Sequence, residues 1–459
     1  MIFILIGIVI IIYSFFNFKK GFSLYLCYKL ILVTNITLIS TPGLPLLTLE
    51  MAITLVFMFM FFIHGSKYQR AHTKFPFAIP FLIYGVVLLA SSMFSVAGFG
   101  AEISNLIKQL SEKIILVWMA WQLIETKDDF KFLFKVVTVI ILGSCIYGLI
   151  EYILQRNPLT EYEASLNSNK DKLIDFSYGA DSYRGYRINS IFEHAIGAGM
   201  VWALYAVFVF IIIQKKYVTI GQIFIPFITA ILCIPCILFT NSRSPLLFFA
   251  VSMVSIVNFK SKRFYPLLLS LLVGAAIAVP LLSDKIINVI KSFFSGDAAN
   301  TVGGSNLEMR LDQFAAAFEL MFQSPFFGLG PSFRDVIDNN LVDRLLGGES
   351  IWLQAVPQMG ILGVVAYVVQ VIYFIVIIPK RFKSRQIFFV SLAYWLTYTI
   401  TSIPGFNHML FFIFIFYFIK SSRVYGQMVK VGNVYGLYLR KGVIHYNVIR
   451  RRPVVIKEH

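Results

Sequence analysis

The sequence predicts an all-α protein whose helices cross a membrane many times. Of its 459 residues, 58% are hydrophobic and only 14% are charged, and the mean hydropathy is +0.77. Uncharged runs recur along the chain, and many are long enough to cross a hydrocarbon core of about 30 Å. Inside lipid only helices and closed barrels satisfy their backbone, and continuous rather than alternating apolar runs favour helices. We therefore expect a polytopic helix bundle and exclude a soluble globule.

About twelve or thirteen membrane spans follow from these runs. Pro404-Gly405 divides the last apolar stretch into two spans. We expect spans at residues 2–16, 23–39, 48–63, 76–96, 109–124, 132–154, 188–213, 218–239, 245–258, 264–282, 352–378, 387–401 and 408–419.

Lysine and arginine predict how the bundle is oriented, because cytoplasmic links carry the positive excess. The basic links, beginning with Lys19-Lys20, fall on one side of these spans. The chain then divides into transmembrane helices over 1–283 with an outer loop at 155–187, an extracytoplasmic loop at 284–351, further transmembrane helices over 352–419 and a basic cytoplasmic tail at 420–459. We expect a multi-pass protein of the cytoplasmic membrane whose site faces the extracytoplasmic side.

The composition also bears on partners and cofactors. The net charge of +17 is concentrated in inner links and the tail, so anionic lipid of the bilayer is the expected partner and nucleic acid is not. The histidines are scattered without zinc spacing, so we expect no metal and no cofactor. Cys233 and Cys236 lie in an apolar span, where thiols are usually packing groups.

The first outward feature is a polar loop that leads into a helix rich in small residues. It carries Arg184, Arg187 and His194, followed by Gly197 and Gly199. Arginine forks suit phosphate groups, so these residues are candidates for binding a phosphorylated substrate. The alternative is that the arginines bind lipid headgroups and the glycines allow close helix packing.

The second feature is a short polar interruption, Thr240-Asn-Ser-Arg-Ser-Pro245, between two apolar runs. Ser242 or Ser244 is expected to cap the following helix, with Pro245 in its first turn. An arginine at a helix start does not profit from the helix dipole, whereas Arg243 together with free backbone amides would form an anion site. Snorkelling of Arg243 to the headgroups is the alternative.

The third feature lies in the long loop. A capping-box pattern at Ser305 and Glu308 opens an amphipathic helix that carries Arg310 and ends at Pro325, and a Gly328-Leu-Gly330 turn and Arg334 follow. We expect one face of this helix to pack against the membrane domain rather than line a substrate groove. That face comprises Leu307, Leu311, Phe314, Phe318 and Phe322. The glycine pair alone is weak evidence for phosphate binding.

The fourth feature is Glu349-Ser350, directly before a helix that contains Gly360 and Gly363. One interpretation is that either residue caps the helix and meets the positive end of its dipole. The other is that Glu349 is a general base that takes a proton from a sugar hydroxyl at the water boundary.

Taken in order, the four features resemble the O-antigen ligase and polysaccharide polymerase superfamily of membrane glycosyltransferases, whose bundle is GT-C-like. The likeness runs from Arg187 to Gly363, with Ser242-Arg243, the helix at Arg310 and Leu353-Gln354 within it. The sequence departs from the ligases at Glu349-Ser350, which stand where the ligases have His-Asn.

The resemblance implies transfer of a glycan from an undecaprenyl pyrophosphate carrier without a catalytic metal. Arg187 and Arg243 would neutralise the leaving pyrophosphate and Glu349 would activate the acceptor hydroxyl. The substrate-binding residues would be Arg184, His194, Arg310, Ser350 and Arg334. A chain-length regulator and a flippase are the implied protein partners.

The missing ligase histidine favours a polymerase of capsule, exopolysaccharide or O-antigen repeat units. Two other enzymatic or transport functions stay open: an O-antigen ligase that uses lipid A core, and a flippase or transporter of lipid-linked glycan. Transport is disfavoured because ionisable residues are expected to be nearly absent from the spans, with Glu50 and Glu151 at their ends. A non-catalytic assembly scaffold is the last alternative.

Overall fold

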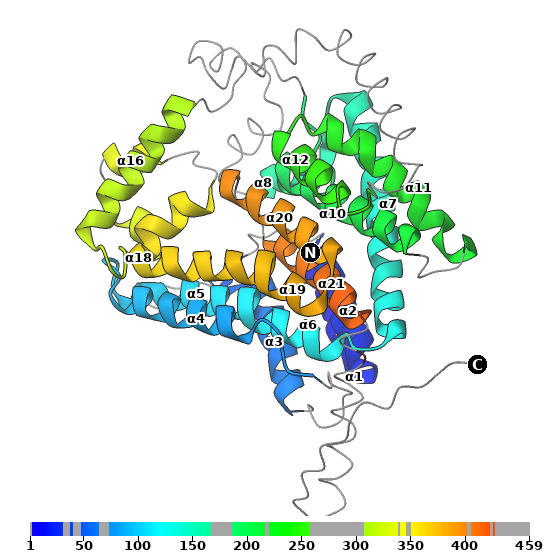
Figure 1. Cartoon of the computed structure of the whole chain (residues 1–459), viewed down its shortest axis with the longest axis horizontal. Helices are drawn as coiled ribbons and strands as arrows, with labels where there is room; N and C mark the ends of the chain where they lie inside the picture. The colour runs from blue at the N-terminus through cyan, green and yellow to red at the C-terminus, as the bar shows by residue number, and fades with distance from the viewer. Residues whose placement is uncertain are drawn as a thin grey trace, which may run out of the picture.

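The computed structural model describes residues 2–30, 37–39, 47–63, 73–166, 186–215, 220–257, 307–337, 340–345, 350–401, 405–422 and 426. These residues are almost entirely helical (Figure 1). Their β-structure is one short antiparallel pair, β1 (Thr37–Ile39) with β2 (Leu47–Thr48). The predicted all-α fold is confirmed.

The helical elements are short to medium in length, and several join end to end. They are α1 (Ile2–Phe16), α2 (Phe18–Tyr28), α3 (Leu49–Ile63), α4 (Ala78–Met93), α5 (Phe99–Leu110), η1 (Ser111–Ile115), α6 (Leu116–Leu123), α7 (Lys127–Leu154), α8 (Pro158–Leu166), α10 (Ala195–Gln214), α11 (Ile220–Phe239), α12 (Arg243–Met253), α16 (Leu307–Gln323), η2 (Phe333–Asp335), α17 (Asn340–Arg344), α18 (Ile351–Ile372), η3 (Tyr373–Ile377), α19 (Ile378–Phe382), α20 (Arg385–Ile400) and α21 (Gly405–Lys420).

Within the described residues, three helices are long and apolar enough to cross a membrane: α7, α10 and the joined helix from Ile351 to Phe382. Shorter apolar helices accompany them. The span expected at 23–39 is wrong, because α2 ends at Tyr28 and Thr37–Ile39 is a strand. The span expected at 109–124 is too short, because α5, η1 and α6 form one continuous helix from Phe99 to Leu123. The span expected at 264–282 lies outside the described residues.

Helix α10 is the centre of one helix group and is buried along nearly its whole length, with α11, α12 and α21 around it (Figure 1). Gly199 lets α12 approach: a Cβ there would lie 2.6 Å from Pro245 Cγ. Helix α12 also packs on α20, and Arg385 at the start of α20 donates to the Val254 carbonyl at the end of α12 (2.9 Å). The two helices are thus antiparallel, so the start of α12 lies toward the C-terminal half of α20.

The second group contains α4, α5, α16 and α18: α18 packs on α4 and on α16, and α4 packs on α5, while α16 rises at an angle from the first part of α18 (Figure 1). Helix α18 is broken at Gly360, where φ is +58° and ψ is −154°, a backbone conformation essentially limited to glycine. The broken turn pairs with the loop after α16: Leu329 N–H donates to Pro357 O (2.8 Å), and Ile361 N–H donates to Pro325 O (2.9 Å). The break therefore leaves these backbone groups satisfied within the protein, as membrane-depth irregularities require.

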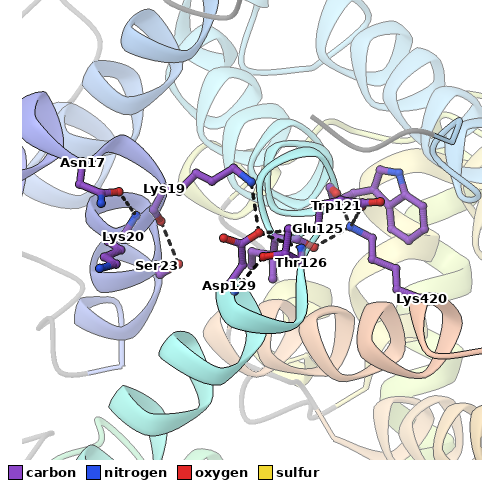
Figure 2. A network of polar contacts seen from close by, with 10 residues as sticks. Asn17, Lys19, Lys20, Ser23, Trp121, Glu125, Thr126, Asp129 and Lys420 are labelled. Carbon is purple, nitrogen blue, oxygen red and sulfur yellow. Dashed lines mark hydrogen bonds and ion pairs between the residues drawn. The ribbon is translucent and has the colours of Figure 1, made fainter. Parts of the chain in front are cut away.

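A charged network joins α2, α6, α7 and α21 near the N-terminus of α7 (Figure 2). Lys420 donates to the carbonyls of Trp121 and Ile124, at 2.7 and 2.6 Å, and pairs with Glu125 at 2.7 Å. An ammonium at the last carbonyls of α6 meets the negative end of its dipole. Lys19 pairs with the Asp129 carboxylate at 3.1 Å, so four helix ends are connected here.

Ionisable residues inside the bundle are more numerous than the sequence predicted. Lys29 forms an ion pair with Glu50 in which both side chains are almost completely buried. Glu112 and Lys113 lie in η1, in the middle of the continuous helix from Phe99 to Leu123. The expectation that such groups are nearly absent from the helices is therefore wrong.

Candidate functional site

Arg187 is fixed onto the turn that connects α11 and α12. Its Nε donates to the Thr240 carbonyl (3.1 Å) and its Nη2 donates to Ser242 Oγ (2.7 Å). The backbone reinforces this junction, because Ile188 N–H donates to Phe239 O (3.3 Å) and the Asn241 amide donates to Tyr186 O (3.0 Å). Two segments that the sequence separates by about fifty residues thus meet, and Arg187 lies beside the start of α12.

Ser242 is the N-cap of α12, as predicted, with extended backbone angles. Its hydroxyl does not cap the helix, because it accepts from Arg187 and donates to Thr240 O (3.0 Å). Helix α12 begins at Arg243, two residues earlier than the sequence predicted. The half-buried Arg243 side chain therefore starts at a helix N-terminus next to a second arginine. Two cations and a helix N-terminus at one point favour an anion.

Glu151, at the end of α7, positions the segment that carries Arg187. This buried carboxylate accepts from the backbone N–H groups of Asn189 (3.1 Å) and Ser190 (2.7 Å) and from the Tyr186 hydroxyl (3.0 Å). It thereby supports Ser190 in a left-handed conformation, with φ of +55°. The sequence alone predicts Glu151 at a span end and predicts no role for it. A carboxylate followed by a polar loop signals such a contact only weakly.

Asn157 completes this support from the loop after α7. Its amide nitrogen donates to Asn189 Oδ1 (2.9 Å) and to Ser190 O (2.8 Å). Its oxygen accepts from the Tyr147 hydroxyl (2.9 Å). The turn before α10 is thus held by side chains that the sequence analysis did not select.

Replacing Glu151 with glutamine should destabilise the fold by about 2 kcal/mol, because an NH₂ group would face N–H or O–H donors. Glu161→Gln is the matched control. Glu161 pairs with Arg156 at the surface, where such a pair contributes about 0–1 kcal/mol. Thermal unfolding of the purified variants in detergent measures both. Equal loss in the two variants would show that Glu151 does not hold the turn.

His194 is the N-cap of α10 and lies near Arg187. Its Nδ1 accepts from the Ile196 N–H (3.1 Å), so the proton of the neutral ring is on Nε2. Burial and the Arg187 charge lower the pKa of His194 to about 4. The imidazole is neutral at pH 7, and its Nε2–H edge is a hydrogen-bond donor rather than a base.

The low pKa of His194 predicts a pH-dependent stability. Since the folded-state pKa of about 4 is below the usual 6.5, the folded state binds this proton less readily than the unfolded chain. The His194 contribution is fully present above pH 6.5 and is lost as the pH falls toward 4. His194→Asn keeps a capping side chain without a titrating ring, so its melting temperature should fall less than that of the wild type over this range. Parallel melting curves would contradict the assignment.

Ser350 and Arg310 meet at the end of α20. Ser350 is the N-cap of α18, accepting from Trp352 N–H (3.3 Å) and donating to the Thr399 carbonyl (2.6 Å). Arg310 Nη1 donates to the next carbonyl, that of Ile400 (3.4 Å). Because α12 is antiparallel to α20, the Arg187–Arg243 junction lies toward the same end of the bundle. This end, formed by residues 240–242, Ser350 and Ile400, is called the motif end below.

Three predicted site residues remain: Glu349, Arg184 and Arg334. Glu349 and Arg184 lie outside the described residues. Arg334 is exposed, with its guanidinium 5.7 Å from the centre of the Phe333 ring. Its helical turn η2 follows the Gly328–Gly330 turn, which packs on the α4–α5 connection, and no described contact joins Arg334 to the motif end. In the structure Arg187, Arg243 and His194 therefore lie close together. Arg310 and Ser350 lie at the same end of the bundle. Arg334 is not placed with them.

The Gly328–Gly330 turn is a docking element. The Gly330 N–H donates to the Gln358 carbonyl (3.0 Å), and Cβ atoms at Gly328 and Gly330 would lie within 2.4 Å of Gln358 and Ser95 atoms. Buried Glu102 accepts from Ser332 N–H at 2.7 Å. Because these amides already have partners, the weak indication of phosphate binding is replaced by a structural role.

Of the described side chains on the predicted packing face of α16, Phe314 packs against the core as expected, but the other three do not. Leu311, Phe318 and Phe322 are exposed, and the buried side of the helix is made by smaller residues next to them. That side comprises Gln313, Ala316, Ala317, Leu320 and Met321. Small side chains allow closer approach to α18 than large ones, and hydrophobicity alone does not distinguish the two faces.

Residues 228–368 match a family model described as O-antigen ligase. This stretch contains Arg243, Arg310 and Ser350, and it begins after Arg187. No curated protein matches the chain. The match bears out the likeness carried by the motifs: residues 228–368 of this membrane protein are similar to the O-antigen ligases, consistent with an O-antigen ligase and polymerase-like superfamily.

Proposed function

We propose that this protein is a polysaccharide polymerase that joins repeat units carried on undecaprenyl pyrophosphate, at the outer face of the cytoplasmic membrane. The observation that carries the proposal is the Arg187–Ser242 junction, which brings two cations to one helix start. The O-antigen ligase match at residues 228–368 supports a glycosyl-transfer role for the same region.

The chemistry requires a charged leaving group to be stabilised. The acceptor hydroxyl oxygen forms a bond to the anomeric carbon of the donor glycan, and the bond from that carbon to the pyrophosphate oxygen breaks. The electron pair leaves with the lipid pyrophosphate, whose negative charge grows in the transition state. Arg187 and Arg243, which are already positioned, provide the compensating charge.

The hydroxyl proton needs an acceptor as the new bond forms. Glu349 immediately precedes Ser350, whose hydroxyl is held at the end of α20 by Thr399 O. In the proposal the Glu349 carboxylate takes this proton as general base. His194 is unsuited to this step because its Nδ1 is occupied by a backbone amide, whereas its Nε2–H suits a sugar or phosphate oxygen.

Analysis of lipid-linked glycans in cells tests the proposal. Deletion of the gene, or Glu349→Gln, should cause single lipid-linked repeat units to accumulate while the protein level of the variant is unchanged. Glu193→Gln is the control, because Glu193 is an exposed carboxylate near the same segment. Normal polymer lengths in the deletion strain would refute the polymerase assignment.

The ligase is the second candidate, because the matching family is described as O-antigen ligase. In that case the deletion strain should contain long polymer that stays on its lipid carrier and never reaches lipid A core. The identity of the accumulating species thus separates the two enzymes in one experiment.

Transport is tested separately because Glu112 and Lys113 lie within the bundle. Reconstituted vesicles that contain labelled lipid-linked glycan distinguish the two classes of function. Elongation without movement across the bilayer supports the enzyme. Movement without elongation would make the protein a flippase or transporter.

A further inference from the structure

Lys113 is a lysine in the interior of the bundle whose described partners are neutral. It lies in η1 and is half-buried. Its ammonium donates to Gln109 Oε1 (3.3 Å) and to the Tyr84 hydroxyl (3.5 Å), both long contacts. Among the described residues, no carboxylate lies within 4.0 Å of this ammonium.

Two lysines that are buried more deeply than Lys113 are paired with carboxylates. Lys29 pairs with Glu50, and Lys420 pairs with Glu125. Glu112 adjoins Lys113 in the chain and lies within electrostatic range of it, as it does of Lys29 and Glu50. The two residues form no direct ion pair in the described part of the chain. Because an interior charge is costly without a directly paired counter-charge, an anion bound at Lys113 would be stabilised.

Aromatic hydroxyls surround this ammonium. Tyr398 of α20 and His408 of α21 lie within electrostatic range of Lys113. Tyr367 of α18 packs edge-on against Tyr84, with ring centres 5.5 Å apart. Tyr84 of α4, Tyr398 of α20 and His408 of α21 thus place neutral hydrogen-bonding side chains near one cation, and such an arrangement suits an oxyanion ligand.

The cluster lies next to the motif end. Tyr398 directly precedes Thr399, whose carbonyl accepts from Ser350, and Ile400, whose carbonyl accepts from Arg310. The Lys113 ammonium reaches back one helical turn to Gln109, as long helical side chains do. Tyr398 therefore relates Lys113 to the carbonyls that Ser350 and Arg310 contact.

We propose that Lys113 is a substrate-binding residue whose ammonium binds a phosphate oxygen of a lipid-linked substrate, with Gln109 and the Tyr84 hydroxyl beside it. The inference rests on the proposed function and adds one cation to its site. An anionic phospholipid headgroup carries the same chemistry, so the experiment must separate the two sources of phosphate.

Binding to the full-length protein tests the inference without turnover. The wild type and Lys113→Met, in phosphatidylcholine nanodiscs, are titrated with undecaprenyl pyrophosphate. Loss of one charge-assisted hydrogen bond should weaken binding about 10- to 100-fold. Lys108→Met is the matched control, since Lys108 is a half-buried lysine of the same helix, and Lys113→Arg should restore most of the affinity. Unchanged melting temperatures show that the variants are folded.

The outcomes are distinct. A loss in Lys113→Met alone supports the inference, whereas wild-type affinity in that variant, or no binding by the wild type, overturns it. If nanodiscs with phosphatidylglycerol lower the wild-type affinity to that of Lys113→Met, the site belongs to bilayer headgroups and the inference also fails. Polymer analysis of the deletion strain tests the proposed function independently. The affinities of the wild type and Lys113→Met are compared without any polymer being formed.

Discussion

Gly360→Ala should destabilise the protein by about 3–5 kcal/mol, enough to remove most of the folded protein from the membrane. An added Cβ would lie 2.5 Å from Pro325 O and 2.8 Å from Gly328 N. The backbone angles at Gly360 also exclude other residues, so relief of the clash would require the break in α18 to change. Thermal unfolding in detergent and the protein level in membranes measure the effect.

Gly100→Ala is the control for this variant. Gly100 lies in the first turn of α5, and nothing lies within 4 Å of its added Cβ. Alanine should therefore be neutral or stabilise the helix by about 0.5–1 kcal/mol. A Gly360→Ala protein as stable as Gly100→Ala would show that α18 does not need the break.

Arg187→Ala should reduce polymer formation about 100- to 1000-fold, the range for removing one preorganised donor from a charged transition state. The variant loses a cation and releases the α11–α12 turn, because both hydrogen bonds from Arg187 go to that turn. Arg187→Lys keeps the charge but cannot bond Thr240 and Ser242 with a planar fork, so it should recover little activity. Polymer length and lipid-linked repeats are measured in cells.

Arg344→Ala controls for loss of an arginine elsewhere in the same protein. Arg344 binds Asp312 and Glu319 on the exposed side of α16, which holds the pKa of Asp312 below its usual value. Surface pairs of this kind contribute little, so polymer formation should be unchanged. If Arg187→Ala also makes normal polymer, the junction with Ser242 is structural and the site assignment fails.

The sequence predicts the fold well for those helices that consist of one continuous apolar run. Continuous apolar runs placed α7, α10 and α20 to within a few residues at most ends, although the run before α10 includes non-helical residues from Ile188 to His194. The two arginine segments were recognised from residue type. Their contact follows from tertiary packing, since Glu151 and Asn157 draw the Arg187 segment toward the α11–α12 turn.

Other features have no local signal in a single sequence. Gly360 in an apolar run is expected to pack in a helix, and only its pairing with residues 325–330 shows that the helix is broken there. Lys113 was counted within an apolar span because neighbouring leucines and isoleucines dominate the window. The aromatic residues near its ammonium come from α4, α20 and α21, which are distant from it in the chain.

The pairing of residues 325–330 with residues 357–362 has a consequence for protein engineering. Four main-chain hydrogen bonds join these two stretches, so neither can be exchanged for the corresponding stretch of a relative without the other. A chimaera with a crossover between them would combine residues 325–330 of one parent with residues 357–362 of another, across these hydrogen bonds. Recombination points before residue 307 or after residue 372 keep both halves from a single parent.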